Sequence, residues 1–195
     1  FTSTAKVDTM LMFNTGQHII TFTGLNADGS RFTKDFPVTV ESIYYPLPEE
    51  YELLCGESGK TWVWAVGNPY REDGAIFGNG PGTATHPEWW AVGPDEMKSW
   101  GLLYDEMVFD LDGGCNFTLI SKGADGTENT VKKDVFVIDL AAKTIKTENG
   151  TPFIREESDP VHTIVRLTEN ELTLTIPTDG GSNREVLMFK QKGYE

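Results

Sequence analysis

Hydrophobic and polar residues alternate along much of this chain, which is the pattern of β-strands that bury one face. The first example spans residues 18–40, where two alternating runs flank the turn-like sequence of residues 26–30. Two such runs around a short turn predict a β-hairpin. An isolated hairpin exposes an apolar face, so we expect this hairpin to pack against the larger domain or against a neighbouring chain.

From Leu103 onward the alternation recurs as a series of strand-like runs. Turn sequences separate these runs at residues 112–114, 123–127, 168–170 and 178–183. Sequential hairpins without helical crossovers form an antiparallel meander. About eight strands in about 150 residues can close on themselves, which removes exposed edges. We therefore expect an all-β fold in which a meander closes into a barrel, with a two-sheet β-sandwich or jelly roll as the alternative.

Short helices are expected in two places outside the meander. Residues 48–56 begin with Pro and acidic residues and end at Gly, which are helix start and stop signals. Residues 94–101 open in the same way and can hold one helical turn. Between them, residues 60–65 alternate as a strand.

All five tryptophans lie between Trp62 and Trp100, most of them in a Gly- and Pro-rich segment at residues 65–101. This segment follows neither a helical nor a strand period, so we interpret it as a long ordered loop. Loops of this length in compact domains are functional or disordered. Disordered tracts are poor in aromatic residues. The segment should therefore bury either its own underside or a ligand.

The spacing of the tryptophans separates two roles. Trp62 and Trp64 face the same side of a strand, so we expect Trp62 to plug one barrel end and Trp64 to join the core. Trp89 and Trp90 are consecutive and cannot easily share one buried face, so one ring should lie near solvent. Either both cap the barrel mouth, or they form a stacking platform for a sugar ring.

Polar side chains near these tryptophans are of the types that bind sugar hydroxyl groups. Gly78, Gly80 and Gly82 would allow a close backbone approach, although turn formation explains them equally well. The candidate ligand-binding residues are Trp64, Tyr70, Asp73, Asn79, His86, Glu88, Trp89, Trp90 and Trp100, with Arg71 as a further polar group.

Composition narrows the classes of partner and the location. The formal net charge of −14 argues against nucleic acid, whose phosphates require a basic surface. No run approaches the roughly 18 apolar residues of a membrane span. The chain begins at Phe1 rather than Met and shows no signal peptide. We expect an exported protein of the cell surface or periplasm, lipid-anchored through an N-terminal portion that precedes this sequence.

No catalytic, cofactor or metal site is predicted. Glu88, Asp105 and Glu106 are the carboxylates nearest the aromatic cluster, but among 30 acidic residues such neighbours arise by chance. The three histidines are far apart in the sequence, and residues 110–114 fit a hairpin turn better than a calcium loop. Cys55 and Cys115 either form a disulfide or remain small buried side chains.

Two stretches resemble known families. Residues 16–30 and 36–40 resemble the closing strands of a PKD-type, immunoglobulin-like module whose first half is absent. Leu53-Leu-Cys-Gly-Glu-Ser-Gly-Lys-Thr-Trp62 resembles the opening of small lipocalin-like barrel domains in exported proteins of polysaccharide-foraging bacteria. Residues 109–114 and 164–174 are similar to hairpins of that family.

The resemblance implies two parts, a partial PKD-like segment at residues 1–42 and a lipocalin-like barrel at residues 43–195 with a long aromatic loop at 65–101. Two features depart from the family. The lipocalin hallmark is Gly-x-Trp, whereas Gly59-Lys-Thr-Trp62 has one more residue between Gly and Trp. The insertion at residues 67–100 is also longer than a small barrel needs.

We therefore expect a non-catalytic protein that captures a polysaccharide or oligosaccharide, alongside other glycan-capture proteins of the cell surface. The alternatives are an adaptor domain that docks a partner protein, a carrier of a small apolar ligand, and a glycoside hydrolase. The carrier ranks low because the expected inward positions look bulky enough to fill a barrel, namely Val63, Phe109, Phe117, Phe136 and Leu174.

Overall fold

The computed structural model describes residues 15–41, 47–67, 74–154 and 161–195. The chain divides into two compact units, the first comprising residues 1–46 and 112–114 and the second residues 47–111 and 115–195. Tyr70, Arg71 and Asp73, three of the candidate polar residues, lie outside the described residues. The assignment of the first unit to a PKD-like module remains a prediction.

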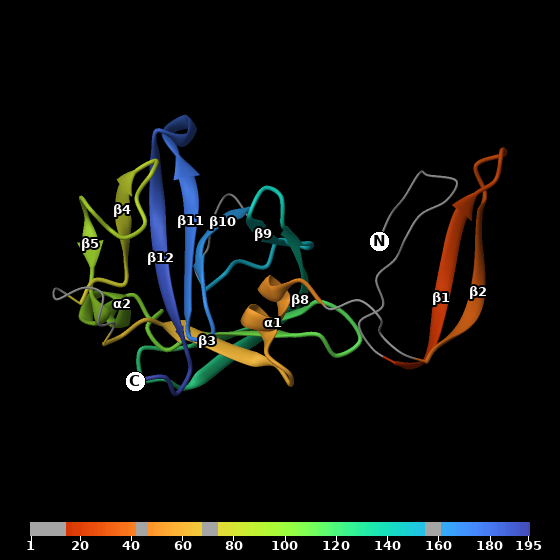
Figure 1. Cartoon of the computed structure of the whole chain (residues 1–195), viewed down its shortest axis with the longest axis horizontal. Helices are drawn as coiled ribbons and strands as arrows, with labels where there is room; N and C mark the ends of the chain where they lie inside the picture. Colours follow the sequence, from red (N-terminus) through yellow and green to blue (C-terminus); the bar gives the residue numbers. More distant parts are fainter. Residues whose placement is uncertain (1–14, 42–46, 68–73, 155–160) are drawn as a thin grey trace. The chain divides into compact units, whose positions relative to one another are not determined.

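The first unit contains the expected hairpin. Strand β1 (Gly16–Leu25) pairs antiparallel with β2 (Arg31–Val40), and Ile20 lies opposite Phe36 (Figure 1). Side chains of directly opposed residues share a face, so one face carries Ile20, Phe22, Phe32 and Phe36. The Phe22 and Phe36 rings meet edge to face with centroids 5.8 Å apart. One side of the hairpin is therefore rich in aromatic side chains, with Lys34 lying over the Phe36 ring on the same face.

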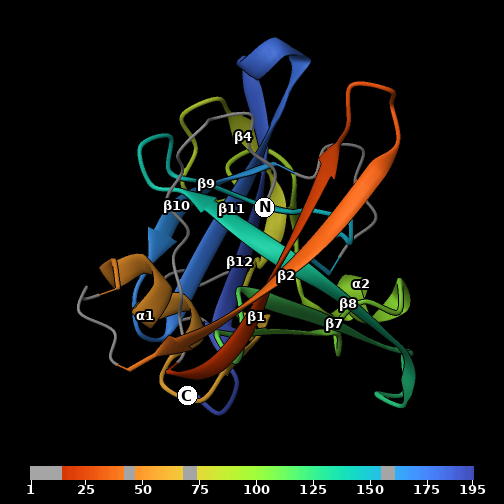
Figure 2. The ribbon, with the colours of Figure 1, turned by 90° about the vertical axis from the view of Figure 1, so that its right-hand side faces the viewer.

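The second unit is a closed antiparallel barrel of eight strands. Each strand pairs with the next around the ring, and β12 pairs with both β11 and β3 to close it (Figures 1 and 2). The expected barrel is thus confirmed in preference to an open sandwich. The ring runs in the order β3 (Lys60–Trp64), β6 (Glu106–Asp110), β7 (Asn116–Lys122), β8 (Glu128–Asp139), β9 (Thr144–Thr147), β10 (His162–Leu167), β11 (Glu171–Thr178) and β12 (Asn183–Gln191).

The segment at residues 65–101 is not a loop throughout, which corrects the sequence prediction. Besides the expected helical turn, α2 (Pro94–Ser99), it contains the two strands β4 (Phe77–Pro81) and β5 (Ala91–Val92). Strand β4 pairs with the first half of β12, whereas β3 pairs with its last residues, so β4 and β5 branch from the barrel wall. The sequence of β4 does not show the alternation of apolar and polar side chains that marks a strand, because every second residue is glycine.

Aromatic side chains fill the barrel interior. Phe109 and Phe117 pack at 5.0 Å between ring centroids, and Phe153 adds a third ring 5.0 Å from Phe117. Phe136 and Leu174 are buried as expected. Val63 was wrongly expected to point inward, because Trp62 and Trp64 on either side of it take the inward positions of β3. This filling leaves the carrier hypothesis without support.

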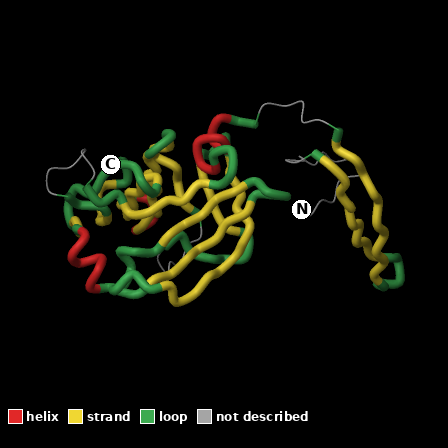
Figure 3. The backbone as a smooth tube through the Cα atoms, turned by 90° about the horizontal axis from the view of Figure 1, so that it is seen from below, coloured by secondary structure: helices red, strands yellow, loops and turns green. Residues whose placement is uncertain are grey.

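The helix α1 (Glu49–Cys55) lies beside the strands of the second unit (Figure 3). Trp62 and Lys60 fix it to the barrel. Trp62 is fully buried, and its indole Nε1 donates a 2.9 Å hydrogen bond to the Leu54 carbonyl. Lys60 Nζ donates to the carbonyls of Leu53 and Glu169 and lies 5.2 Å from the Trp62 ring centroid. Burial lowers the pKa of Lys60, with the Glu169 charge acting in the opposite direction.

The two cysteines are free thiols in this structure, Cys55 buried and Cys115 half-buried. Burial raises the pKa of the Cys55 thiol to about 12 and that of Cys115 to about 11. Both groups are therefore protonated near neutral pH and behave as small apolar side chains. The structure therefore favours two free cysteine side chains over a disulfide between Cys55 and Cys115.

Asp134 anchors the segment that inserts Phe153 into the barrel. Its carboxylate accepts hydrogen bonds from the backbone N–H groups of Val135, Asn149 and Thr151, and from the Asn149 side chain at 2.8 Å. Burial raises the pKa of Asp134, but these hydrogen bonds outweigh that effect and hold the pKa below its ordinary value. The carboxylate therefore stabilises this fold in its ionised form.

Acid should destabilise the barrel in part through Asp134. Because the folded-state pKa is depressed, this contribution is present above the unfolded-state pKa of about 4 and is lost as pH falls through the folded value. We expect the melting temperature to fall more steeply below pH 4 in the wild type than in the Asp134→Asn variant, which is less stable at pH 7. Glu148→Gln, at an exposed carboxylate, is the control. Parallel acid profiles for wild type and Asp134→Asn would contradict this role.

Candidate functional site

Three of the five tryptophans reach the surface, and all three belong to the segment between β4 and β6. Trp89 is 62% exposed, and Trp90 and Trp100 are each 45% exposed. Trp62 and Trp64 are buried, as their spacing predicted. The sequence predicted that one of the Trp89 and Trp90 rings lies near solvent. This is confirmed, and in fact both rings are exposed.

Trp90 and Trp100 form what we call the aromatic platform, together with Phe77 beneath them. The two indoles are near parallel, with an interplanar angle of 28° and centroids 6.1 Å apart. Each meets Phe77 edge to face, Trp90 at 5.5 Å and Trp100 at 6.4 Å. A ring sandwiched between two indoles needs about 7–8 Å, twice the contact distance of carbon atoms. A ligand would therefore lie on the exposed surface of the pair and not between its members.

Phe77 connects the aromatic platform to the barrel core. It is fully buried, and its ring lies 6.1 Å from that of Trp64, which in turn lies 4.7 Å from Phe189 of β12. Trp64 therefore supports the platform from below, through Phe77, and does not itself reach the surface. Its indole Nε1 also donates a 3.0 Å hydrogen bond to the Leu102 carbonyl. We accordingly place Trp64 in the core and not among ligand contacts.

Asn79 of β4 fixes the backbone of the residues that carry Trp89 and Trp90. Its carbonyl accepts hydrogen bonds from the N–H groups of Glu88 and Trp89, at 2.9 and 3.1 Å. Its N–H donates to the Trp90 carbonyl, and its side-chain oxygen accepts from the Trp90 N–H at 3.0 Å. Asn79 is thus a positioning residue whose amide oxygen is already occupied.

The glycines of β4 allow a close backbone approach, but the chain itself makes that approach. A Cβ at Gly78 would lie 2.1 Å from the Trp90 carbonyl oxygen, and one at Gly80 would lie 2.6 Å from Ala84 Cβ. A Cβ at Gly82 would lie 2.3 Å from the Gly181 carbonyl oxygen. Gly78 and Gly80 therefore seat residues 82–90, which we call the platform loop, on β4, whereas Gly82, just after β4, makes room for the Gly181 carbonyl. No room is left for a ligand at the same backbone atoms.

Helix α2 positions Trp100. The Trp100 N–H donates to the Glu96 carbonyl at 3.1 Å, and Met97 on the inner side of the helix is fully buried. Gly101 follows in the left-handed region, with φ of +74°, and turns the chain so that the Leu102 N–H reaches the Met97 carbonyl. Trp100 is therefore held from its backbone while its ring remains accessible.

The remaining predicted residues lie at the margin of the platform. His86 and Glu88 are exposed, and His86 Nδ1 lies 3.3 Å from the Thr85 hydroxyl. Glu88 attracts the guanidinium of Arg184 on β12, whose pKa is lowered by burial and raised by this charge. Sequence reasoning missed Phe77 and Arg184. Phe77 could have been identified from the sequence, because it is an aromatic residue that begins the run in which every second residue is glycine.

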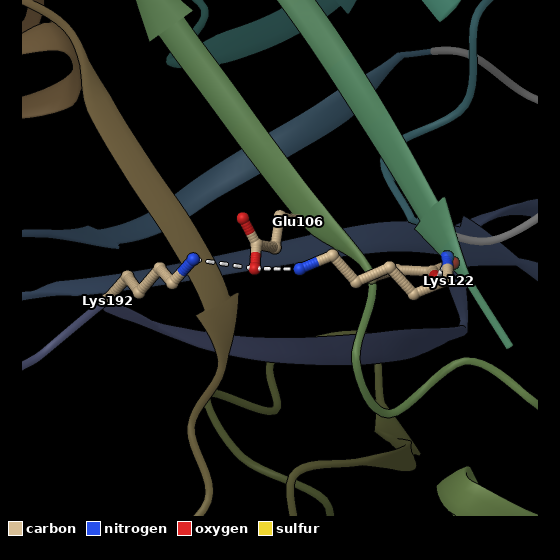
Figure 4. Close-up of polar contacts among 4 residues, drawn as sticks. Glu106, Lys122 and Lys192 are labelled. Atoms are coloured by element: carbon tan, nitrogen blue, oxygen red, sulfur yellow. Dashed lines mark hydrogen bonds and ion pairs between the residues drawn. The ribbon is translucent and has the colours of Figure 1, made fainter. Parts of the chain in front are cut away.

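Two of the three carboxylates nearest the aromatic cluster in the sequence, Asp105 and Glu106, take part in ion pairs and hydrogen bonds. Glu106 Oε1 lies between the ammonium groups of Lys122 and Lys192, the latter at 2.8 Å (Figure 4). Burial raises the pKa of Glu106, but the hydrogen bonds that Lys122 and Lys192 donate to it have the larger combined effect. The pKa of Glu106 is therefore below its ordinary value. Asp105 accepts the Lys122 backbone N–H at 2.6 Å, and burial raises its pKa to about 6. These contacts join β6, β7 and the segment after β12.

Across residues 15–41, 47–67, 74–154 and 161–195, no group of three or more His, Cys, Asp or Glu side chains is arranged to hold a metal ion. In the described part of the chain, no helix is long and apolar enough to cross a membrane.

Comparison with known proteins adds no assignment. No protein-family model matches the chain, and no curated protein matches it. The closed eight-stranded antiparallel barrel is consistent with the resemblance to lipocalin-like domains, which therefore holds at the level of fold.

Proposed function

We propose that this chain is a non-catalytic carbohydrate-binding protein that holds a polysaccharide or oligosaccharide on the aromatic platform. The observation that carries the proposal is the exposure of Trp90 and Trp100 as a near-parallel pair fixed from below by Phe77. Sugar rings present axial C–H groups that stack on indole faces, and their hydroxyl groups bind nearby polar side chains. The exposed indole pair would supply the first kind of contact, and the exposed side chains of His86 and Glu88 could supply the second.

The rigidity of the platform supports a binding role. Exposed apolar rings cost stability in water, and a fold usually buries them unless they contact a partner. Here Asn79 and the β4 glycines hold the Trp90 backbone in place, so little conformational entropy is lost when a ligand stacks. An open surface contacts only one side of a sugar ring, so we infer that the ligand is a chain with several rings and not a monosaccharide.

The adaptor hypothesis differs in what it requires at the same surface. A protein partner would need a contiguous apolar patch of several hundred Å². Exposed polar side chains lie near the tryptophans in the sequence, namely His86 and Glu88 before Trp89 and the acidic first turn of α2 before Trp100. This mixture of rings and hydrogen-bonding groups favours sugars over an apolar protein surface.

Removal of either platform ring should abolish most of the glycan binding. We expect Trp90→Ala and Trp100→Ala each to weaken affinity at least tenfold, since a central aromatic contact contributes about 2 kcal/mol. The measurement is calorimetric titration with soluble β-glucan, mannan and arabinoxylan. Tyr194→Ala, which removes an exposed aromatic side chain near the C-terminus, is the matched control and should bind like the wild type. Binding that survives both platform substitutions would refute the proposal.

Asn79→Ala should weaken binding without removing any ring. The substitution deletes the acceptor of the Trp90 N–H, and loss of one such hydrogen bond costs about 1–3 kcal/mol where the donor becomes unsatisfied. We expect the Trp90 indole to become more mobile and affinity to fall about three- to tenfold. Fluorescence anisotropy of the tryptophans and the same titrations check this. Unchanged affinity would show that Asn79 does not position the platform.

A further inference from the structure

The charges around the aromatic platform are mainly negative. Within residues 74–104, the ionised side chains are Glu88, Asp95, Glu96 and Lys98. Lys98 Nζ lies 5.9 Å from the centroid of the Tyr104 ring, so the positive charge of this segment faces a neighbouring aromatic side chain. Three carboxylates and one ammonium group give this region an acidic balance, in keeping with the net charge of −14 for the chain.

Helix geometry brings one of these carboxylates, that of Glu96, close to Trp100. Because the Trp100 N–H bonds to the Glu96 carbonyl, Glu96 lies one turn before Trp100 on the same side of the helix. Asp95 precedes it in the first turn of α2 and is also exposed. Side chains one turn apart lie within about 6 Å at their Cβ atoms, which is inside the screening length of about 8 Å at physiological salt.

Glu88 contributes less to this acidic field than the two α2 carboxylates. Its charge is partly balanced by the half-buried guanidinium of Arg184. The repulsion that a ligand would meet therefore comes mainly from the α2 side of the platform, next to Trp100. This asymmetry identifies Asp95 and Glu96 as the residues to change.

We propose that the aromatic platform selects uncharged glycans and discriminates against glycans that carry carboxylate or sulfate groups. This inference rests on the proposed carbohydrate-binding function and adds the charge class of the ligand. A carboxylated ring stacked on Trp100 would bring its negative charge beside Glu96, and like charges at such a contact are strongly unfavourable. A neutral ring meets no such repulsion, and its hydroxyl groups can donate hydrogen bonds to the same carboxylates.

The sharpest test uses one polymer in two charge states. Each soluble neutral glycan (β-glucan, mannan and arabinoxylan) is titrated into the protein before and after chemical oxidation of part of its hydroxymethyl groups to carboxylates. We expect the oxidised form of any glycan that binds to have an affinity at least tenfold lower at low salt, with the difference narrowing as salt is raised. The affinity of the neutral form should change little with salt.

Neutralising the α2 carboxylates should relax this selectivity. The double variant Asp95→Asn, Glu96→Gln is expected to bind the oxidised polymer at least threefold more tightly than the wild type does, while neutral binding stays within about twofold. The control Glu52→Gln, Glu57→Gln removes the same charge from α1 and the turn that follows it, and should leave the preference unchanged. Helix α1 lies on the opposite side of the barrel from α2 (Figure 2).

The outcomes separate the two proposals. Equal or tighter binding of the oxidised polymer by the wild type would overturn the charge selectivity while leaving carbohydrate binding intact. Unchanged selectivity in the α2 double variant, or an equal change in the α1 control, would overturn the role of Asp95 and Glu96. Absence of binding to every polymer in both charge states would overturn carbohydrate binding itself, and the selectivity with it.

Discussion

Replacing Trp62 with alanine is expected to lower the free energy of unfolding by about 4 kcal/mol, the largest single effect we predict. The side chain is fully buried, and its removal leaves a large cavity where α1 meets the barrel. The Leu54 carbonyl also loses its indole donor, and Lys60 loses the ring beside its ammonium group. For a chain of this size, such a loss corresponds to a decrease in melting temperature of about 8–16 °C.

Trp89→Ala is the matched control for this result, since it removes the same side chain from an exposed position. Surface substitutions away from special features usually change stability by about 0.5 kcal/mol or less. Trp62→Phe should fall between the two, because it keeps most of the volume but leaves the Leu54 carbonyl unpaired. Thermal or urea unfolding measures all three. Similar stability of the Trp62→Ala and Trp89→Ala variants would contradict the burial of Trp62.

Gly78→Ala is expected to displace the platform loop and to lower stability by about 3 kcal/mol, the upper part of the usual range for overpacking. The new Cβ would lie 2.1 Å from the Trp90 carbonyl oxygen and 3.0 Å from Ala91 Cα, so backbone atoms must move. The pairing of Gly78 with Ala91, which joins β4 to β5, should break first. Glycan binding should be lost together with the position of Trp90.

Gly93→Ser provides the comparison within the same segment. Gly93 has extended backbone angles at the N-cap of α2, and its added Cβ would meet its nearest neighbour, the Gly74 carbonyl oxygen, at 3.9 Å. Serine is a favoured N-cap residue, so this variant should match or exceed the stability of the wild type. Melting curves and iodide quenching of tryptophan fluorescence distinguish the two glycine variants. A Gly78→Ala protein with wild-type melting and quenching would show that the loop is not seated on β4.

The barrel could be predicted from the sequence because its strands follow a simple rule. Alternating apolar residues separated by turn sequences specify hairpins, and hairpins in series specify an antiparallel meander. The same reasoning placed α1 from its Pro and Gly signals and placed Trp62 and Trp64 on one buried face. These features depend on local patterns, which a single sequence displays directly.

The parts that escaped prediction depend on contacts between distant segments. Strand β4 carries glycines where a strand normally shows side chains, because the platform loop packs against its backbone. Trp90 stacks on Trp100, and Phe77 of β4 contacts both rings from below. These three residues are far apart in the sequence. The Asp134 anchor also joins β8 to residues 149–151 through hydrogen bonds that no spacing rule indicates.

The sequence therefore predicted which kinds of residue form the candidate site, but it did not predict how they are arranged. Trp89, Trp90 and Trp100 were expected near a ligand, and all three are exposed. Asn79 was expected to bind ligand, yet its side-chain oxygen accepts the Trp90 N–H. The two roles of a polar residue, contact with ligand and support of the loop, have the same sequence signature. Whether any of these residues contacts a glycan remains a prediction.

The most direct test of the central claim follows the five tryptophans separately. In the ¹⁵N-labelled protein each indole N–H gives its own NMR resonance, which single substitutions assign. On addition of the neutral glycan that binds most tightly, we expect the Trp90 and Trp100 resonances to shift with saturation while those of Trp62 and Trp64 stay in place. Shifts confined to Trp62 and Trp64 would place the ligand in the barrel core, and shifts of none of the five would contradict the aromatic platform as a glycan-binding site.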